Sequence, residues 1–143
     1  MEKWCIHDLK QFGNCYVKVL AIDGADLYTA GYTNSSILRY WKNGVSTDIP
    51  TTNTAYANAI TVNNGDVYIA GNEVVAGKAV AKFWKNGVVI VLGDGIRNSR
   101  ANGIAVKGTD VYLCGEVQGS TNSSDYATLW KNGQATTIGL QNS

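Results

Sequence analysis

The sequence is poor in charged residues and carries no cluster of one sign. Charged residues make up 16% of the 143 residues, with 12 Lys plus Arg against 11 Asp plus Glu. Nucleic acids and anionic membranes are held by a strong positive field, which this composition does not create. We therefore expect neither nucleic acid nor a membrane surface among the partners of this chain.

Histidine is almost absent, and so are the motifs of common catalytic sites. His7 is the single histidine, and no Gly-x-Ser-x-Gly, paired-histidine zinc motif or phosphate-binding glycine loop occurs. Oxygen-ligand clusters of the Asp-x-Asp-x-Asp type are also missing. The sequence therefore predicts no catalytic residue, no metal site and no cofactor, and a protein that is not an enzyme.

Cysteine and long hydrophobic runs are equally scarce. Cys5, Cys15 and Cys114 stand at no metal-like spacing, and nothing signals an oxidising compartment. Free thiols are expected, with a Cys5–Cys15 disulfide as the alternative. No window reaches the ~18 apolar residues of a membrane span. The N-terminus lacks the layout of a signal peptide, so we expect a cytoplasmic protein if that N-terminus is native, and a secreted one if a leader was removed.

A four-residue motif, Trp-Lys-Asn-Gly, occurs three times and organises the rest of the chain. Its copies span 41–44, 84–87 and 130–133, at intervals of 43 and 46 residues. A second motif, Asp-Leu/Val-Tyr, precedes each copy and is followed by a glycine. A repeat of this length, with short apolar runs between turns, predicts a repeated β-architecture.

Each repeat divides into four short apolar runs that predict four strands. The last two runs meet at the Asn-Gly pair, a strong hairpin signal because a type I′ turn needs positive φ at both central residues. A polar loop is expected between the second and third strands, for example at 72–77. No helical periodicity appears, so the chain is predicted to be all-β, with repeats at 17–55, 56–99 and 100–143.

Two all-β folds fit three repeats of four strands: a β-trefoil and an arc of three propeller blades. A barrel strand buries one face, so its apolar residues should alternate with polar ones. Residues 67–70, 79–81 and 88–92 are instead apolar on both faces, as expected of strands between two sheets. We therefore predict three four-stranded antiparallel blades, half of a β-propeller, with a lectin-like β-trefoil as the alternative.

The motifs also carry a family resemblance. Asp-Val-Tyr-Ile-Ala-Gly, an Ala-rich strand ending in Trp-Lys-Asn-Gly, then Leu-x-Asp-Gly and Tyr-Ala-Asn-Ala-Ile resemble the blade repeats of uncharacterised bacterial β-propeller proteins. The resemblance covers 17–143, nearly the whole chain. It implies a propeller, but members of that family carry enough repeats to close a ring alone, whereas this chain has three.

A closed propeller needs roughly 4–8 blades. Three blades therefore form an open arc, and its first and last blades each expose an apolar sheet face. We therefore predict an obligate homodimer, in which the first blade of each chain packs on the last blade of the other to form a six-bladed propeller. Residues 1–16 are expected to act as a strand or clasp at the seam. The competing interpretation is that the chain is a fragment of a longer protein.

The repeated side chains of the two motifs are expected to be structural. Each Trp of Trp-Lys-Asn-Gly should anchor the packing of its blade, with the stem of the following Lys over the Trp ring. The repeated Asp should accept backbone N–H bonds in its turn. The functional alternatives are aromatic platforms for sugar rings at the Trp residues and a repeated metal site at the Asp residues.

Ligands of a propeller bind around its central channel, on the face that carries the loops between blades. The candidate ligand-binding residues on that face are Tyr16, Tyr56, Asn58, Glu73, Arg97, Arg100, Asn102 and Glu116. Further polar residues, such as Tyr32 and Asn72, are expected on the same loops. A ring of Tyr, Arg and Asn near an axis forms a polar pocket of the kind that binds small molecules.

Three positions of this set are expected to match between repeats. Tyr16, Tyr56 and Arg100 should be equivalent, as should the residues two places later in each repeat. Glu73 and Glu116 are also expected at equivalent loop starts, where they could form a carboxylate pair.

The function predicted from these features is non-catalytic. We expect a binding or scaffold module that presents the mouth of its channel to a glycan, a peptide, a small molecule or a protein partner. The alternative is a propeller-type hydrolase or lyase that uses Glu73 and Glu116.

Overall fold

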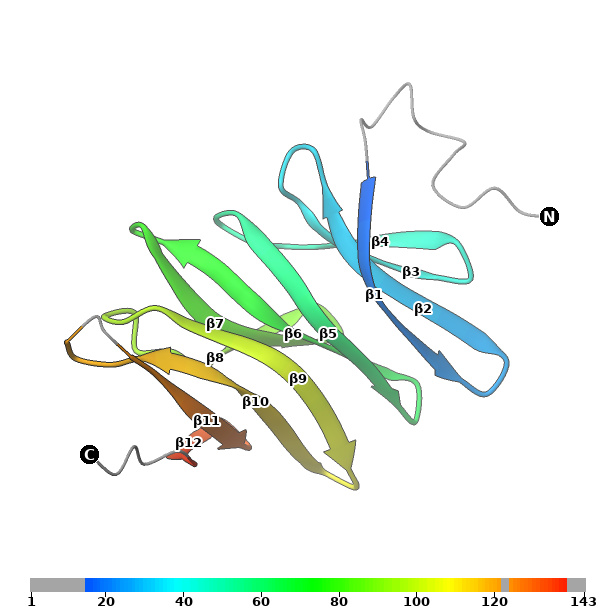
Figure 1. Ribbon diagram of the computed structural model, residues 1–143. Helices are drawn as coiled ribbons and strands as arrows, with labels where there is room; N and C mark the ends of the chain where they lie inside the picture. Colours follow the sequence, from blue (N-terminus) through cyan, green and yellow to red (C-terminus); the bar gives the residue numbers. More distant parts are fainter. Residues whose placement is uncertain (1–14, 122–123, 139–143) are drawn as a thin grey trace.

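The computed structural model describes residues 15–121 and 124–138, which form twelve strands (Figure 1). None of these residues lies in a helix that could cross a membrane. The strands are β1 (Cys15–Asp23), β2 (Asp26–Thr33), β3 (Leu38–Lys42), β4 (Val45–Ile49), β5 (Ala55–Asn63), β6 (Asp66–Val75), β7 (Lys78–Lys85), β8 (Val88–Val91), β9 (Ser99–Lys107), β10 (Asp110–Gln118), β11 (Asp125–Lys131) and β12 (Gln134–Thr137). The expected N-terminal clasp spans 1–16. Its residues 1–14, which include Cys5 and His7, lie outside the described residues.

The strands form three separate four-stranded antiparallel sheets, one for each repeat. Within each sheet the strands follow chain order, β1 to β4, β5 to β8 and β9 to β12. The all-β prediction of three four-stranded antiparallel units is therefore confirmed. No described strand of one sheet pairs with a strand of another, so the described chain lacks the barrel that joins the repeats of a β-trefoil.

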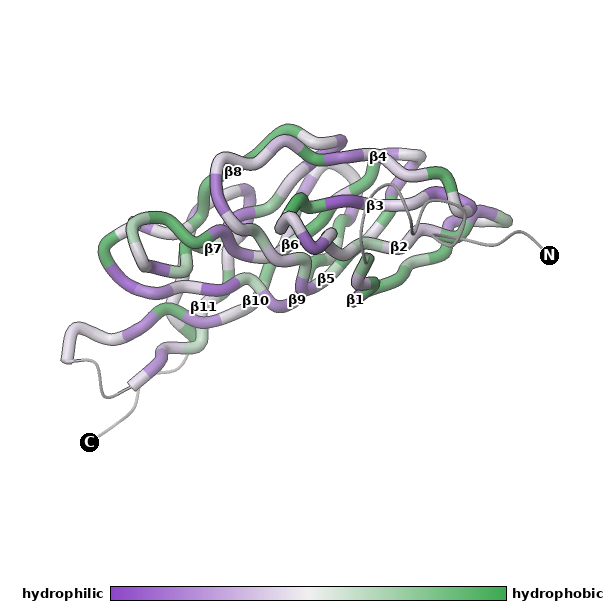
Figure 2. Tube along the Cα trace, turned by 90° about the horizontal axis from the view of Figure 1, so that it is seen from above, coloured by the Kyte–Doolittle hydropathy of each residue, from purple (hydrophilic) through white to green (hydrophobic). Residues whose placement is uncertain are grey.

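The sheets stand in a row and pack face to face. The first strands of the three sheets, β1, β5 and β9, lie side by side along one edge of the row (Figures 1 and 2). The last strands β4 and β8 lie along the opposite edge in Figure 2. The first and last sheets therefore form the two ends of the row, and each has one face without a neighbouring sheet among residues 15–121 and 124–138.

Two apolar clusters hold the row together, one at each contact between sheets. The first cluster joins sheets one and two through Tyr28, Ala30, Leu38, Ile49, Ala55, Ala57, Ile60, Val67, Ile69 and Trp84. The second joins sheets two and three through Tyr68, Ala70, Ala81, Phe83, Ala101, Leu113 and Trp130. We call the face on the side of the preceding sheet in chain order the leading face, and the face on the side of the next sheet the trailing face. The same two names are used for the outer faces of the first and third sheets.

The three tryptophans of Trp-Lys-Asn-Gly are all buried, and Trp84 and Trp130 belong to the two clusters between sheets. Their exposed fractions are 4% for Trp41, 1% for Trp84 and 0% for Trp130. The structural interpretation of these residues is therefore confirmed, because a ring this deeply buried offers no platform to a sugar. At Trp84 and Trp130 the large aromatic side chain adds to the apolar area that the contact between sheets removes from water.

The Asn-Gly pairs form the expected hairpin turns. Asn86 and Gly87 have φ of 49° and 82°, and the other two pairs match them closely. The Asn side chain also ties the turn to the Asp-Leu/Val-Tyr motif. Asn86 accepts a 2.9 Å hydrogen bond from the Val67 amide and donates a 2.9 Å bond to Asp66, and the same pair of bonds occurs in the other two sheets.

Two details of the motifs differ from the prediction. The repeated Asp accepts from the Asn side chain, not from backbone amides, because the Asn oxygen takes the backbone donor itself. The Lys stems do not lie over the Trp rings. Lys85 lies 5.5 Å from the centre of the Tyr68 ring and 3.7 Å from Asp66, since Tyr68 is its direct cross-strand partner. The two motifs are thus one cross-strand unit, repeated three times.

The glycine after each Asp-Leu/Val-Tyr motif permits a bulge in the neighbouring first strand. A Cβ at Gly71 would lie 1.7 Å from the Tyr56 carbonyl oxygen, and Gly31 and Gly115 are equally crowded. The pairing shifts at this point in all three sheets, so that one residue of the first strand has no partner. A side chain larger than hydrogen is excluded where the backbones approach this closely.

The polar loop expected at 72–77 is wrong for the second sheet. β6 continues to Val75 and β7 begins at Lys78, joined by a tight turn at Ala76 and Gly77 with φ of 48° and 77°. The strands remain paired because the polar residues Asn72 and Glu73, only 6% and 2% exposed, find hydrogen-bond partners inside the protein.

Candidate functional site

The candidate site lies where the first strand of each sheet begins. Tyr16 on β1 pairs with Tyr32 on β2, and Tyr56 on β5 pairs with Asn72 on β6. In the third sheet the corresponding pair is Arg100 on β9 and Glu116 on β10. Tyr16, Tyr56 and Arg100 therefore occupy equivalent positions, as predicted.

Three tyrosines from two sheets come together here, and we call them the tyrosine arc. The rings of Tyr16 and Tyr32 stack with their centres 5.2 Å apart, at an interplanar angle of 26°. The Tyr32 and Tyr56 rings meet edge to face at 5.7 Å and 79°. Tyr16 is 45% exposed and Tyr56 36%. The arc thus presents aromatic surface to solvent in two geometries that aromatic rings favour.

A charged pair continues this line of residues on the third sheet. The Arg100 guanidinium lies 3.5 Å from the Glu116 carboxylate, and their side chains are 48% and 36% exposed. A pair this exposed contributes little to stability. Its groups remain accessible from solvent, so that they can also meet a ligand.

Two candidate asparagines are the unpaired residues of the strand bulges. Asn58 follows Ala57 in β5, and Asn102 follows Ala101 in β9. Asn58 donates 3.2 Å to the Asn72 side chain and 3.0 Å to the Ala101 carbonyl of the next sheet. Asn58 therefore links two sheets, while Asn102 is exposed and has no hydrogen-bond partner among the described residues.

Glu73 is a buried anchor and not part of the exposed site. One carboxylate oxygen accepts from the backbone amides of Thr52 and Asn53, at 3.1 and 2.8 Å, and from both of their side chains. The other accepts 2.6 Å from the Lys82 ammonium, whose side chain is only 12% exposed. The carboxylate thus fastens the β4–β5 connection to the second sheet.

The environment of Glu73 keeps it ionised. Burial by itself would raise the pKa of this carboxyl. The hydrogen bonds from Lys82, Thr52 and Asn53, together with the Lys82 charge, outweigh burial and lower the pKa. A group held in this way is poorly suited to donate a proton, because it stays ionised to lower pH than an ordinary Glu.

The expected equivalence of Glu73 and Glu116 is wrong. Glu116 lies opposite Arg100, the position that Asn72 occupies opposite Tyr56. Glu73 is one residue further along and pairs with Ala55, so its counterpart in the third sheet is Val117. A shift of one residue along a strand turns a side chain to the other face of the sheet, and these two carboxylates therefore form no pair.

Arg97 is held within its own loop. Its guanidinium lies 2.9 Å from the Asp94 carboxylate. The other Asp94 oxygen accepts backbone bonds from Ile96 and Arg97 at 2.8 and 3.0 Å. These bonds, the backbone ones above all, lower the pKa of Asp94. Arg97 therefore closes the β8–β9 connection, and no described contact joins it to the tyrosine arc.

Some residues of this region escape sequence reasoning. Tyr32, expected on a loop, lies on β2 at the centre of the tyrosine arc. Its contact with Tyr56 depends on how two sheets pack, which one repeat does not reveal. Lys82 was not expected near Glu73. It pairs with Gly71, two residues before Glu73 on the same face of the sheet, and its ammonium reaches Glu73 diagonally. No cluster of three or more metal-ligating side chains occurs within 15–121 and 124–138.

Comparison with known proteins adds no family to this description. No family model matches the sequence, and no curated protein matches it.

Proposed function

We propose that this chain is half of a six-bladed β-propeller, completed by a second copy, and that the completed ring is a non-catalytic binding module. The chain would then share its architecture with the bacterial propeller proteins that its repeats resemble. The observation that carries the proposal is the contrast between equivalent residues. Side chains buried between sheets inside the chain are exposed on the outer faces of the first and last sheets.

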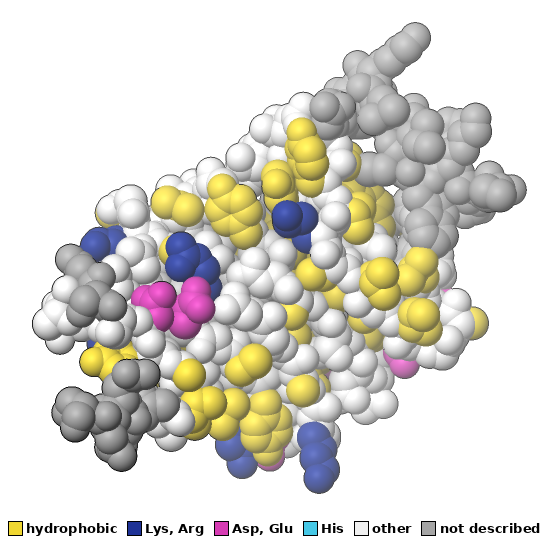
Figure 3. All heavy atoms as spheres, viewed as in Figure 1, with side chains coloured by type: hydrophobic (Ala, Val, Ile, Leu, Met, Phe, Trp, Pro, Cys, Tyr) yellow, Lys and Arg dark blue, Asp and Glu magenta, His cyan; other side chains and the backbone are white. Residues whose placement is uncertain are grey.

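The leading face of the first sheet is apolar and exposed. Leu20 is 66% exposed, whereas its counterpart in the second sheet, Ile60, is 9% exposed. Val17 is 53% exposed, against 2% for its counterpart Ala57. Figure 3 shows hydrophobic side chains at the surface along β1. Trp41, at 4%, is the exception on this face.

The trailing face of the third sheet shows the same contrast. Cys114 is exposed, whereas its counterparts Ala30 and Ala70 are both 0% exposed. Ile138 is 61% exposed, against 1% for its counterpart Ile49. Within the chain, the trailing face of one sheet packs on the leading face of the next at two contacts. The exposed leading face of the first sheet and the exposed trailing face of the third therefore fit the matching faces of a second copy better than an unrelated partner.

Two copies related by a two-fold axis bring each trailing face onto the leading face of the other chain. Both seams are then alike and no face is left over, which closes the assembly. The ring has six blades, within the range that propellers use. The tyrosines, the asparagines and the charged pair of both chains would then form one line around the channel. At each seam Glu116 would contact Tyr16 of the other copy, in the way that Tyr32 contacts Tyr56 within one chain.

The ligand of this ring would bind at the tyrosine arc and the neighbouring Arg100–Glu116 pair. Exposed aromatic faces beside accessible hydrogen-bonding groups suit a ligand with an apolar face and polar edges, such as a glycan or a peptide side chain. Catalysis is not part of the proposal. The described bonds of Glu73 are made to Thr52, Asn53 and Lys82, and the Glu116 carboxylate lies beside Arg100.

A binding screen with matched variants tests the module. We expect a glycan and peptide array to yield saturable ligands of the wild type that are lost with Tyr56→Ala and with Arg100→Ala. Lys107→Ala, an exposed change at the other end of β9, is the control and should bind normally. An array without a hit, or hits that survive both substitutions, would remove the tyrosine arc as a binding site.

A further inference from the structure

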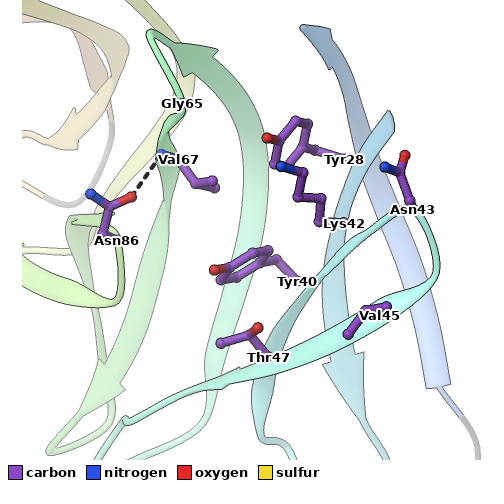
Figure 4. Close-up of a pocket in the computed structure, with 9 residues that line it drawn as sticks. All are labelled: Tyr28, Tyr40, Lys42, Asn43, Val45, Thr47, Gly65, Val67 and Asn86. Carbon is purple, nitrogen blue, oxygen red and sulfur yellow. Dashed lines mark hydrogen bonds between the residues drawn. The ribbon is translucent and has the colours of Figure 1, made fainter. Parts of the chain in front are cut away.

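A groove lies between the first and second sheets, at the end opposite to the tyrosine arc. Its volume is about 450 Å³, within the range of small-molecule sites. Its lining residues come from β2, β3, β4, β6 and the turns beside them: Tyr28, Tyr40, Lys42, Asn43, Val45, Thr47, Gly65, Val67 and Asn86 (Figure 4). We call it the first groove.

Tyr40 and Thr47 place two hydroxyl groups in the first groove. They are direct partners across β3 and β4, and Figure 4 shows them one above the other on the wall formed by the first sheet. Neither hydroxyl has a hydrogen-bond partner among the described residues. Tyr28 and Val67, only 2% and 5% exposed, lie deeper. The groove therefore combines an apolar floor with two unused polar groups.

The second sheet carries apolar residues where the first sheet has these hydroxyls. Phe83 and Ile90, direct partners across β7 and β8, are the counterparts of Tyr40 and Thr47. Phe83 is 5% exposed, and both residues pack into the cluster between sheets two and three. The repeat itself therefore does not require hydroxyls at these positions. Apolar side chains occupy these positions at the contact between sheets two and three. The two hydroxyls of Tyr40 and Thr47 are therefore a feature of the first groove and not of the repeat.

The charged and amide groups of the first groove are already engaged. The Lys42 ammonium lies 3.0 Å from Asp26 and 5.5 Å from the centre of the Tyr28 ring. Asn43 bonds to Leu27 and Asp26, and Asn86 makes the corresponding bonds in the second sheet. None of the described lining residues carries an uncompensated charge, so an ionic ligand gains little there.

We propose that the first groove binds a neutral, polyhydroxylated ring, such as one residue of a saccharide. The hydroxyls of Tyr40 and Thr47 both donate and accept, which matches the hydroxyls of a sugar. The Tyr40 ring and the Val45 side chain offer apolar surface to its C–H face. This site is separate from the tyrosine arc and stands without the proposed ring.

The proposal is tested with neutral sugars as probes. Wild-type protein is titrated with glucose, galactose, mannose and N-acetylglucosamine, followed by saturation-transfer NMR and calorimetry, with glucuronate as an anionic comparison. We expect at least one neutral sugar to bind saturably and glucuronate to bind more weakly. The double variant Tyr40→Phe with Thr47→Ile, which copies the residues of the second sheet, should lower the affinity by roughly thirtyfold, because two hydrogen bonds are lost.

A control variant separates this site from the tyrosine arc. Tyr56→Ala should leave sugar binding unchanged. The proposal is overturned if no neutral sugar saturates the protein, if the Tyr40/Thr47 variant binds as well as wild type while it remains folded by circular dichroism, or if Tyr56→Ala abolishes the binding.

Discussion

The side-chain amide of Asn58 donates a 3.0 Å hydrogen bond to the carbonyl oxygen of Ala101 in the neighbouring sheet. Asn58 is the unpaired residue of its strand bulge, and Asn102 holds the same place in the third sheet. In the first sheet the residue equivalent to Ala101 is Val17, on the outer, leading face. A second copy that docks as the internal sheets do would therefore receive the Asn102 amide at its Val17 carbonyl.

Asn102→Ala should weaken the proposed dimer without unfolding the chain. Each seam would lose one hydrogen bond of about 1 kcal/mol, hence about 2 kcal/mol per dimer and a dissociation constant raised by roughly thirtyfold. Sedimentation velocity across a dilution series measures this change. Asn58→Ala is the matched comparison, because it should lower the free energy of unfolding of the chain. Equal dimer affinity of wild type and Asn102→Ala would contradict this contact.

Leu20→Asp should separate the two chains of the proposed ring. The substitution removes one buried Leu side chain from each seam and places a charge there, and the lost burial alone raises the dissociation constant by roughly a thousandfold. Val88 on β8 is the control, since its exposed fraction of 67% matches the 66% of Leu20 but it lies on an internal sheet. Val88→Asp should keep the dimer intact. If both variants behave alike, the free face of β1 is not a seam.

Glu73→Gln should destabilise the fold by about 2 to 3 kcal/mol. The neutral amide leaves the Lys82 ammonium, 12% exposed, without its counter-charge, and breaking a largely buried pair is costly. Glu116→Gln removes the exposed partner of Arg100 and should change stability by less than about 1 kcal/mol. Urea unfolding followed by tryptophan fluorescence measures both. A small effect of Glu73→Gln would show that the β4–β5 connection does not depend on this carboxylate.

The contribution of Glu73 should disappear in acid. Because folding lowers the pKa of Glu73, the unfolded chain binds its proton at higher pH than the folded one. The stabilisation is therefore complete above the unfolded pKa, near 4.3, and is lost as the pH falls through the lowered folded pKa. Hydrogen bonds also lower the pKa of Asp26, Asp94 and Asp110, so the wild type should lose stability in acid through several groups.

The comparison with Glu73→Gln isolates this one carboxyl. The difference in unfolding free energy between wild type and variant should be constant near neutral pH and should shrink as the pH falls below the unfolded pKa. Unfolding curves at a series of pH values give this difference directly. A difference that stays constant down to the lowest pH at which the protein folds would contradict the lowered pKa.

The repeat predicts the sheets well because each strand is specified locally. The Asn-Gly turns fix the hairpins through positive φ, as at Asn43 and Gly44, and each apolar run has the length of a strand. The connection that differs most from the prediction, at 72–77, has polar residues that look like a loop. Asn72 and Glu73 enter the strand because partners elsewhere in the fold satisfy them, and single-strand patterns do not contain this information.

The candidate site is harder to predict, because it depends on register and on contacts between sheets. The sequence predicted Glu73 as the counterpart of Glu116. The strand register instead makes Asn72 the counterpart, one residue before Glu73. The contact of Tyr32 with Tyr56 joins residues of different sheets. Equivalent positions in a repeat are visible in the sequence, but which of them is exposed depends on which face has a neighbour.

The mass of the protein in solution tests the two-chain ring most directly. Sedimentation equilibrium over a wide range of concentrations should give about 31 kDa, twice the 15.3 kDa of one chain. A stable species at the mass of a single chain, or growth into open polymers, would contradict the closure of the ring by a second copy.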